Sequence, residues 1–239
     1  MPWWYAVVES RHQAVQNPTS PDKIRVLGEL LGLGPESSVL DIASGKGGPA
    51  RILADTFGCR VTCVENAPEF AAVARERATD LIEVVEADAK DFEIEPGAYD
   101  AALCLGASFA YGGLVETLNR LKPAAPFVAV GEPYWRAWPL PADVELKDGW
   151  EDFLPLPETV ARFESADVRV VSLIDSSLDD WDRYETLHWL ALDDWLAANP
   201  NDPDAEEFRE RGRHYREQYL RWQRDLLGWA IFVCRRLGT

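Results

Sequence analysis

Three acidic residues lie at the ends of apolar runs in the first half of the chain. Asp41 stands near the end of SSVLDIA, Glu65 ends CRVTCVE and Asp88 ends LIEVVEAD. An ionised carboxylate accepts hydrogen bonds from ligand hydroxyl groups and attracts ligand cations. The spacing therefore predicts a binding site to which three successive strands each contribute an acid.

A glycine-rich loop follows Asp41 directly. Gly45, Gly47 and Ala50 fit the pattern G-x-G-x-x-A, which binds the phosphates of a dinucleotide where a strand turns into a helix. A similar loop could hold S-adenosylmethionine (SAM) instead. Both cofactors present a ribose whose hydroxyl groups the Glu65 carboxylate could accept. The glycine pattern alone therefore leaves both cofactors open.

Charge separates the two cofactors. A pyrophosphate binds bare backbone N–H groups at a helix N-terminus, and a nearby carboxylate would repel it. SAM has no phosphate and carries an α-ammonium and a sulfonium, so Asp41 would attract it directly or through backbone and water. Asp88 could accept from an adenine amino group, and the backbone N–H of Ala89 could reach the adenine ring. The three acids therefore favour SAM.

Each acid also has a purely structural interpretation. Asp41 could cap a turn or helix, Glu65 could be a solvated strand end, and Asp88 could cap the turn before FEIEP. Two other functions stay open at this point. One is a NAD(P)-dependent oxidoreductase, although Asp41 and the separated last strand are evidence against it. The other is a non-catalytic module that binds SAM or S-adenosylhomocysteine (SAH).

The elements that must position these acids alternate between strands and helices. Seven apolar runs predict strands, over residues 37–43, 59–65, 81–88, 98–108, 126–133, 168–174 and 229–236. Alternation of this kind predicts an α/β fold with a doubly wound, Rossmann-like, mostly parallel sheet that is covered on both faces. Right-handed crossovers would then bring the strand ends, and with them the acids, to the ligand-binding edge.

A single domain over residues 1–239 accounts for the whole chain, with three segments outside the alternation. An N-terminal helical cap is expected over 1–35, a loop insertion rich in Pro and Trp over 133–157, and a helical insertion over 175–228. Aromatic residues at helical spacing predict two helices in the helical insertion, with NPNDPD as the turn between them.

The glycine loop and its neighbours resemble the class I SAM-dependent methyltransferases. The family's first motif reads DIASGKG here, over residues 41–47, with Ala43 in place of the first glycine. VENA resembles the second motif, which carries the ribose acid, and EADAKDF resembles the third. The resemblance covers about residues 20–175. It implies a last strand, 229–236, that runs antiparallel between the fifth and sixth strands.

Four further segments, QNPTSPDK, CLGASFAYGG, GEPYW and WDRYETLHWLALDDWLAANP, resemble a group of uncharacterised bacterial methyltransferases. The likeness implies SAM as cofactor and an N-terminal segment that closes over its methionine end. The residues expected to bind the cofactor are Asn17, Asp41, Ala43, Gly45, Gly47, Glu65, Asn66, Asp88, Ala89, Leu105 and Gly106.

Candidates for the acceptor side come from the end of the fifth predicted strand. Glu132 is the first candidate for an acid or base, and Tyr134 for the wall of the acceptor pocket. Alternatively, both residues only anchor and pack the following loop. His12 is a further candidate base, whereas the amphipathic helix around His188 favours a core or interface role. In-line transfer from a sulfonium mainly requires alignment, so a general base is optional.

Composition limits the partners. The formal net charge of −17 argues against a nucleic acid bound through its phosphates. The sequence has no apolar run of the roughly 18 residues that a membrane helix needs, and no signal-peptide pattern. Four cysteines without a C-x-x-C pair predict free thiols in a reducing cytoplasm, and three histidines without ligand spacing predict no metal site. We therefore expect a small-molecule acceptor, with a homodimer through the insertion helices as an alternative use of that segment.

Overall fold

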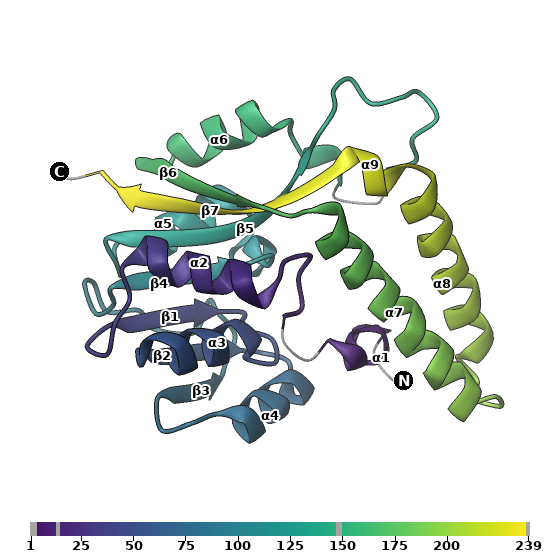
Figure 1. Ribbon diagram of the computed structural model, residues 1–239, viewed down its shortest axis with the longest axis horizontal. Coiled ribbons are helices and arrows are strands. Elements are labelled where there is room, and N and C mark those ends of the chain that lie inside the picture. Colours follow the sequence, from purple (N-terminus) through teal and green to yellow (C-terminus); the bar gives the residue numbers. More distant parts are fainter. Residues whose placement is uncertain (1–3, 13–14, 147–149, 238–239) are drawn as a thin grey trace.

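A seven-stranded sheet with the order β3-β2-β1-β4-β5-β7-β6 forms the centre of the computed structural model, which describes residues 4–12, 15–146 and 150–237 (Figure 1). β7 pairs antiparallel with β5 and β6, whereas the pairs among the first five strands are parallel. The strands are β1 (Ser38–Ile42), β2 (Arg60–Glu65), β3 (Ile82–Glu86), β4 (Ala101–Leu105), β5 (Phe127–Trp135), β6 (Val168–Asp175) and β7 (Leu227–Arg236). The predicted fold is confirmed, including the place of the antiparallel last strand.

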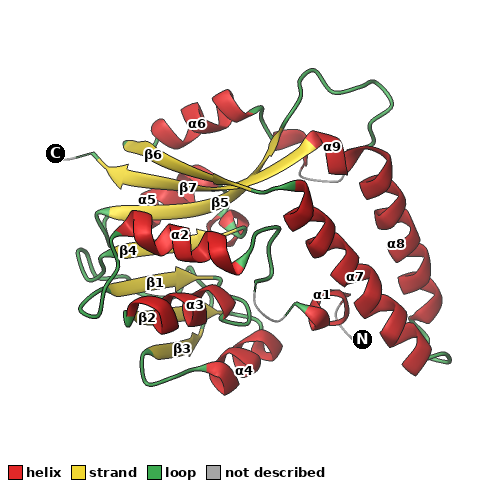
Figure 2. Ribbon diagram, viewed as in Figure 1, coloured by secondary structure: helices red, strands yellow, loops and turns green. Residues whose placement is uncertain are grey.

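Helices cover both faces of the sheet (Figure 2). Buried side chains of α2 and α3 pack on one face, and those of α5 and α6 pack on the other. The helices and helical turns are α1 (Trp4–Val8), η1 (Glu9–Arg11), α2 (Pro21–Leu31), α3 (Gly48–Phe57), α4 (Pro68–Arg77), η2 (Ser108–Tyr111), α5 (Leu114–Leu121), η3 (Trp150–Asp152), α6 (Leu156–Glu164), α7 (Leu178–Ala198), α8 (Ala205–Gln218), the π-turn η4 (Tyr219–Gln223) and α9 (Arg224–Leu226).

Local sequence explains where the elements near the glycine loop begin and end. β4 is buried at every residue, as a central parallel strand must be when helices lie on both faces. The helix α2 begins after Ser20, whose hydroxyl accepts a hydrogen bond from the backbone N–H of Lys23. The helix α3 lies between Gly47 and Gly58, which both have φ near +70°, a conformation that suits glycine.

The strand ends differ by a few residues from the sequence-based predictions, and two differences are larger. Residues 133–135 were expected to open a loop, but they continue β5 because they pair with the antiparallel strand β7. The helix α6 was not predicted. Its buried face consists of Thr159 and Phe163, four residues apart, and the prolines before it obscured this short periodicity.

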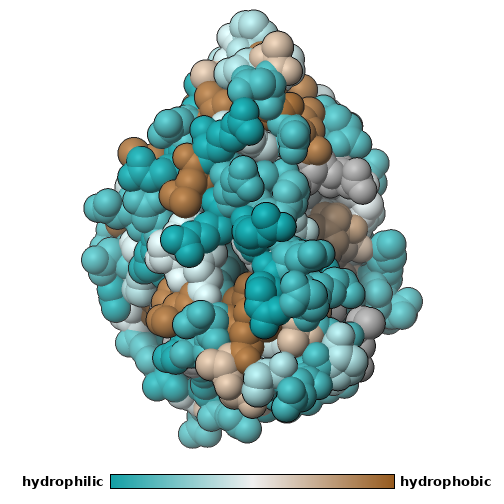
Figure 3. All heavy atoms as spheres, turned by 90° about the vertical axis from the view of Figure 1, so that its right-hand side faces the viewer, coloured by the Kyte–Doolittle hydropathy of each residue, from teal (hydrophilic) through white to brown (hydrophobic). Residues whose placement is uncertain are grey.

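Helices α7 and α8 lie within the predicted helical insertion and pack against each other and against α1 (Figure 1). The surface over these helices is mostly hydrophilic, with small scattered apolar patches (Figure 3). In the part of the chain that the structure describes, no helix combines the length and apolarity needed to cross a membrane.

Candidate active site

A cavity of about 960 Å³ opens at the carboxyl ends of β1, β2 and β4. Its other walls come from the N-terminal segment, α7, α8 and β7. Every residue predicted to bind the cofactor lines it except Gly47, which precedes α3. The lining members of that set are Asn17, Asp41, Ala43, Gly45, Glu65, Asn66, Asp88, Ala89, Leu105 and Gly106.

Asp41 is the buried acid of this cavity. It is 2% exposed, and its Oδ2 atom has no hydrogen-bond partner among the described residues. Burial, and then the charge of Glu65, raises the pKa of Asp41 to about 7. An unpaired buried carboxylate is costly unless a cation or donor meets it. The α-ammonium of SAM would supply both, so this residue fits that cofactor.

Glu65 connects two loops at the cavity wall. Its Oε2 accepts a hydrogen bond of 2.8 Å from the backbone N–H of Gly45, and its Oε1 accepts one of 2.8 Å from that of Ala67. A carboxylate has about four lone-pair sites, so capacity for ribose hydroxyl groups remains. Glu65 can therefore support the glycine loop and still meet a nucleoside.

The glycine loop follows a left-handed path. Ala43 and Gly45 have φ of 54° and 58°. Ala43 thus adopts a left-handed conformation that favours glycine, at a cost of about 1–2 kcal/mol for its Cβ. A Cβ on Gly45 would overlap Oε1 of Gln16, which also accepts a 2.6 Å hydrogen bond from the backbone N–H of Lys46. The loop and the N-terminal segment are therefore closely fitted.

Other predicted cofactor residues lie at, or contact, the ends of β3 and β4. Asn17 donates through Nδ2 to the carbonyl oxygen of Leu105 at 3.1 Å, and a Cβ on Gly106 would stand 2.5 Å from its Oδ1. Asp88 is exposed and accepts a 2.8 Å bond from the backbone N–H of Lys90. Asp88 therefore caps a turn, which was the structural alternative to a binding role, and it also lines the cavity.

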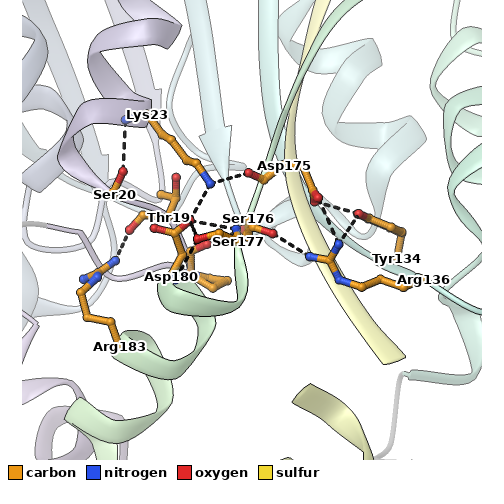
Figure 4. A network of polar contacts seen from close by, with 11 residues as sticks. Thr19, Ser20, Lys23, Tyr134, Arg136, Asp175, Ser176, Ser177, Asp180 and Arg183 are labelled. Carbon is orange, nitrogen blue, oxygen red and sulfur yellow. Dashed lines mark hydrogen bonds and ion pairs between the residues drawn. The ribbon is translucent and has the colours of Figure 1, made fainter. Parts of the chain in front are cut away.

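A polar network fixes α7 against α2 and the N-terminal segment (Figure 4). Lys23 donates through Nζ to Oδ2 of Asp180 at 2.5 Å and to the carbonyl oxygen of Asp175 at 2.6 Å. Arg183 donates to the carbonyl oxygen of Thr19. The first turn of α7 is thereby held beside the strand ends, and the rest of the helix extends along the cavity.

Aromatic side chains line the walls that the N-terminal segment, the η3 region, α7, α8 and β7 contribute, and we call this part the aromatic end of the cavity. They are Trp4, Tyr5, Trp150, Phe153, Trp181, Tyr184, Trp189, Tyr215 and Trp229. The buried Nε1 atoms of Trp181 and Trp189 have no hydrogen-bond partner among the described residues. Buried donors of this kind are rare in folded proteins, and both indoles belong to residues that line the cavity.

Glu132 and Tyr134 do not line the cavity. Pro133 does, and because side chains alternate along a strand, its two neighbours point to the opposite face. The Tyr134 hydroxyl donates to Oδ1 of Asp175 at 2.7 Å (Figure 4), and the Ser108 hydroxyl donates to the Glu132 carboxylate. The catalytic roles predicted for these two residues gain no support from their positions.

Glu9 and His188 line the cavity instead, and neither was predicted as a site residue. Oε1 of Glu9 lies 3.2 Å from Nε2 of His188. Burial would raise the pKa of Glu9, but the hydrogen bond and charge of His188 outweigh it and lower that pKa. His12 is buried beside them, and burial lowers its pKa to about 4. The one sequence signal was the three-residue spacing of Glu9 and His12.

Comparison with known proteins agrees with this geometry. The model of the methyltransferase domain family matches residues 39–123. The uncharacterised protein YjhP of Escherichia coli (strain K12) is 32% identical over an alignment of 245 positions that covers 98% of each chain. Two SAM-dependent methyltransferases solved with SAH, from Thiobacillus denitrificans and Geobacter sulfurreducens, superpose with TM-scores of 0.91 and 0.90, each at 32% identity over 99% of both chains.

The likeness covers the whole chain and extends beyond the sheet to the N-terminal segment and the insertion helices. It confirms the predicted methyltransferase and rejects the alternative of a nicotinamide-dependent oxidoreductase. The unpaired Asp41 carboxylate supplies the physical reason, since it suits an ammonium and not a pyrophosphate. The chain therefore belongs to the SAM-dependent methyltransferases, and SAM is its cofactor.

Proposed function

We propose that this methyltransferase acts on a small molecule bound at the aromatic end of the cavity. The main support is that one cavity of about 960 Å³ is lined both by the acidic residues at the strand ends and by the aromatic residues. Small-molecule pockets usually measure about 300–1,000 Å³. The volume therefore accommodates a cofactor and a small acceptor together, and is too small for a folded macromolecule.

When bound, SAM supplies a methyl group already activated on a sulfonium sulfur. Asp41 accepts from its ammonium, Glu65 accepts from the ribose hydroxyl groups, and Asp88 with Ala89 meets the adenine. The chain then has to hold the acceptor atom in line with the methyl carbon, at about 3–3.5 Å. Alignment is the main demand, and the aromatic walls supply it by restricting the acceptor's orientation.

The walls indicate the chemistry of the acceptor. Flat apolar side chains favour a flat or apolar body, because aromatic surfaces gain both burial and ring contacts. The unpaired indole N–H groups of Trp181 and Trp189 favour at least one hydrogen-bond acceptor atom on that body. We therefore propose an aromatic or otherwise flat molecule that carries oxygen or nitrogen.

Composition supports the setting that we propose for the enzyme. The net charge of −17 speaks against nucleic acid as the acceptor. The four cysteines are free and buried, which agrees with work in the reducing cytoplasm. We also propose that residues 175–228 serve a single domain as the acceptor-side cap. A homodimer through their outer faces is a second proposal, which sedimentation at several concentrations would test.

A screen of small molecules with isotope-labelled SAM tests the acceptor class. Once an acceptor is found, Trp189→Phe, which removes the indole N–H, should raise its KM and leave the affinity for SAH unchanged. Trp138→Phe is the matched control, because Trp138 is 61% exposed and lies outside the cavity. Transfer of label only to proteins or nucleic acids in a fractionated extract would reject a small-molecule acceptor.

A further inference from the structure

Three side chains suited to a metal ion meet where the N-terminal segment and α7 form the cavity wall. They are Glu9, the first residue of the helical turn η1, His12, which directly follows that turn, and His188 on α7. One ligand atom from each lies within 4.8 Å of the others, and these three form the one such group found among residues 4–12, 15–146 and 150–237. The acid and first histidine are close in sequence, whereas His188 is brought to them by the fold.

His12 has one ring nitrogen without a hydrogen-bond partner among the described residues. That nitrogen is Nε2, and the residue is 1% exposed. Its Nδ1 lies 3.4 Å from the carbonyl oxygen of Val15. A carbonyl oxygen only accepts, so Nδ1 carries the proton and Nε2 keeps its lone pair. Metal-binding histidines almost always donate their second nitrogen in this way.

We propose that Glu9, His12 and His188 bind one divalent ion of the zinc type. Two histidines and one glutamate, with a fourth position left for water or substrate, make up a common set of ligands in catalytic zinc sites. Glu9 and His188 both line the cavity, so the fourth position on the ion would face the cavity. The ion would also link the N-terminal segment to α7, and these two segments each form a wall of the cavity.

The distances require only small movements. Two ligand atoms on a tetrahedral zinc ion stand about 3.3 Å apart, given metal–nitrogen distances of about 2.0–2.1 Å. The Glu9 and His188 atoms already lie 3.2 Å apart, and the widest separation within the group is at most 4.8 Å. Side-chain torsions that close about 1.5 Å would therefore complete the site.

The surroundings hold the carboxylate by hydrogen bonds, and on metal binding His188 would exchange its hydrogen bond to Glu9 for the ion. Gln16 donates to Oε2 of Glu9 at 3.4 Å, and the Tyr184 hydroxyl donates to Oε1 at 3.5 Å. Such hydrogen bonds to a ligating carboxylate are typical of the shell around a metal. Lys46 is a nearby cation that opposes binding, but its Nζ donates to the backbone oxygen of Glu9 and not to the carboxylate.

This proposal reverses the sequence-based expectation of no metal site. It does not depend on the identity of the methyl acceptor, so it can be tested with the metal alone. The untagged, chelator-treated full chain would be titrated with Zn²⁺ by calorimetry. Co²⁺ would be added separately, because its visible spectrum reports ligand type and geometry. We expect one ion per chain and a Co²⁺ spectrum of nitrogen and oxygen ligands.

The three histidines of the chain provide a matched series. His12→Gln and His188→Gln should each weaken Zn²⁺ binding by at least roughly tenfold, as should Glu9→Gln. His214→Gln changes a histidine of α8 outside the group and should leave the affinity unchanged. Circular dichroism of each metal-free variant confirms folding before titration, and SAH affinity reports the cofactor site separately.

Three results would overturn the proposal. The first is the absence of stoichiometric Zn²⁺ binding by the folded wild type. The second is an equal loss in His214→Gln and in the two cluster histidine variants. The third is a Co²⁺ spectrum dominated by thiolate ligands, which would move the ion to the cysteines. SAH binding that persists in any of these cases leaves the proposed methyltransferase site intact.

Discussion

Protonation of Asp41 should control cofactor affinity near neutral pH. Burial and the charge of Glu65 raise its pKa to about 7, so a large part of the free protein holds a neutral carboxyl there. The ammonium of SAM or SAH interacts favourably only with the ionised form. Binding therefore requires loss of the Asp41 proton, and affinity should fall as pH drops below 7.

The magnitude follows from that pKa. With a pKa of about 7, roughly one tenth of the Asp41 carboxyl groups are ionised at pH 6 and roughly nine tenths at pH 8. The apparent dissociation constant scales inversely with the ionised fraction. SAH should therefore bind roughly tenfold more weakly at pH 6 than at pH 8, a difference of about 1.4 kcal/mol. In Asp41→Asn, affinity should be lower and nearly constant over this range.

Calorimetry with SAH at pH 6, 7 and 8 measures this slope, and buffers of different ionisation enthalpy report the released proton. Glu132→Gln is the matched control. Burial also raises the pKa of Glu132 to about 7, but the residue lies on the opposite face of the sheet and outside the cavity. That variant should keep the wild-type slope. Equal wild-type affinity at pH 6 and pH 8, or a slope retained by Asp41→Asn, would refute the reasoning.

Three further changes test the site and its support. Glu65→Ala should weaken SAH binding by about 1.5–3 kcal/mol in calorimetry, because charge-assisted bonds to the ribose and to Gly45 are lost together; unchanged affinity would place the ribose elsewhere. Ser177→Ala should lower the free energy of unfolding in urea by about 1 kcal/mol, because Ser177 and Asp180 form the capping box of α7; an unchanged urea midpoint would show that the cap adds nothing. Asp41→Asn should raise the melting temperature more at pH 8 than at pH 5, since the pKa of about 7 in the folded protein exceeds the ordinary aspartate pKa of 3.8 and ionisation then costs up to about 4 kcal/mol; a rise independent of pH would exclude titration of Asp41 as its cause.

The cofactor end of the site could be predicted because strand topology places it. Asp41 and Glu65 follow uninterrupted apolar runs, and parallel strands with right-handed crossovers bring such ends together. The register Asp41↔Cys63 between β1 and β2 leaves the acids of these strands adjacent at one edge. Glycines mark the turn between β1 and α3, so its position is visible in the sequence as well.

Other features could not be predicted from the sequence, because they depend on contacts between segments that are far apart along the chain. Residues 133–135 carry a proline and two aromatic residues, and they become strand only because β7 supplies partners for them. That same extension decides the orientation of Tyr134, which a loop would have left undetermined. Glu9 and His188 are separated by 179 positions, and no local pattern links an acid in a short helical turn to a histidine on a 21-residue helix.

The acceptor end is ambiguous in sequence for a physical reason. Trp181 and Trp189 are eight residues apart on one face of α7, which is the spacing of an ordinary packed helix. A core and a ligand chamber demand the same apolar stripe, and only the tertiary structure distinguishes them. Here the stripe faces a cavity whose opposite wall is the strand edge. Changes along α7 can therefore alter the acceptor chamber while Asp41 and Glu65, fixed by the sheet, continue to hold the cofactor.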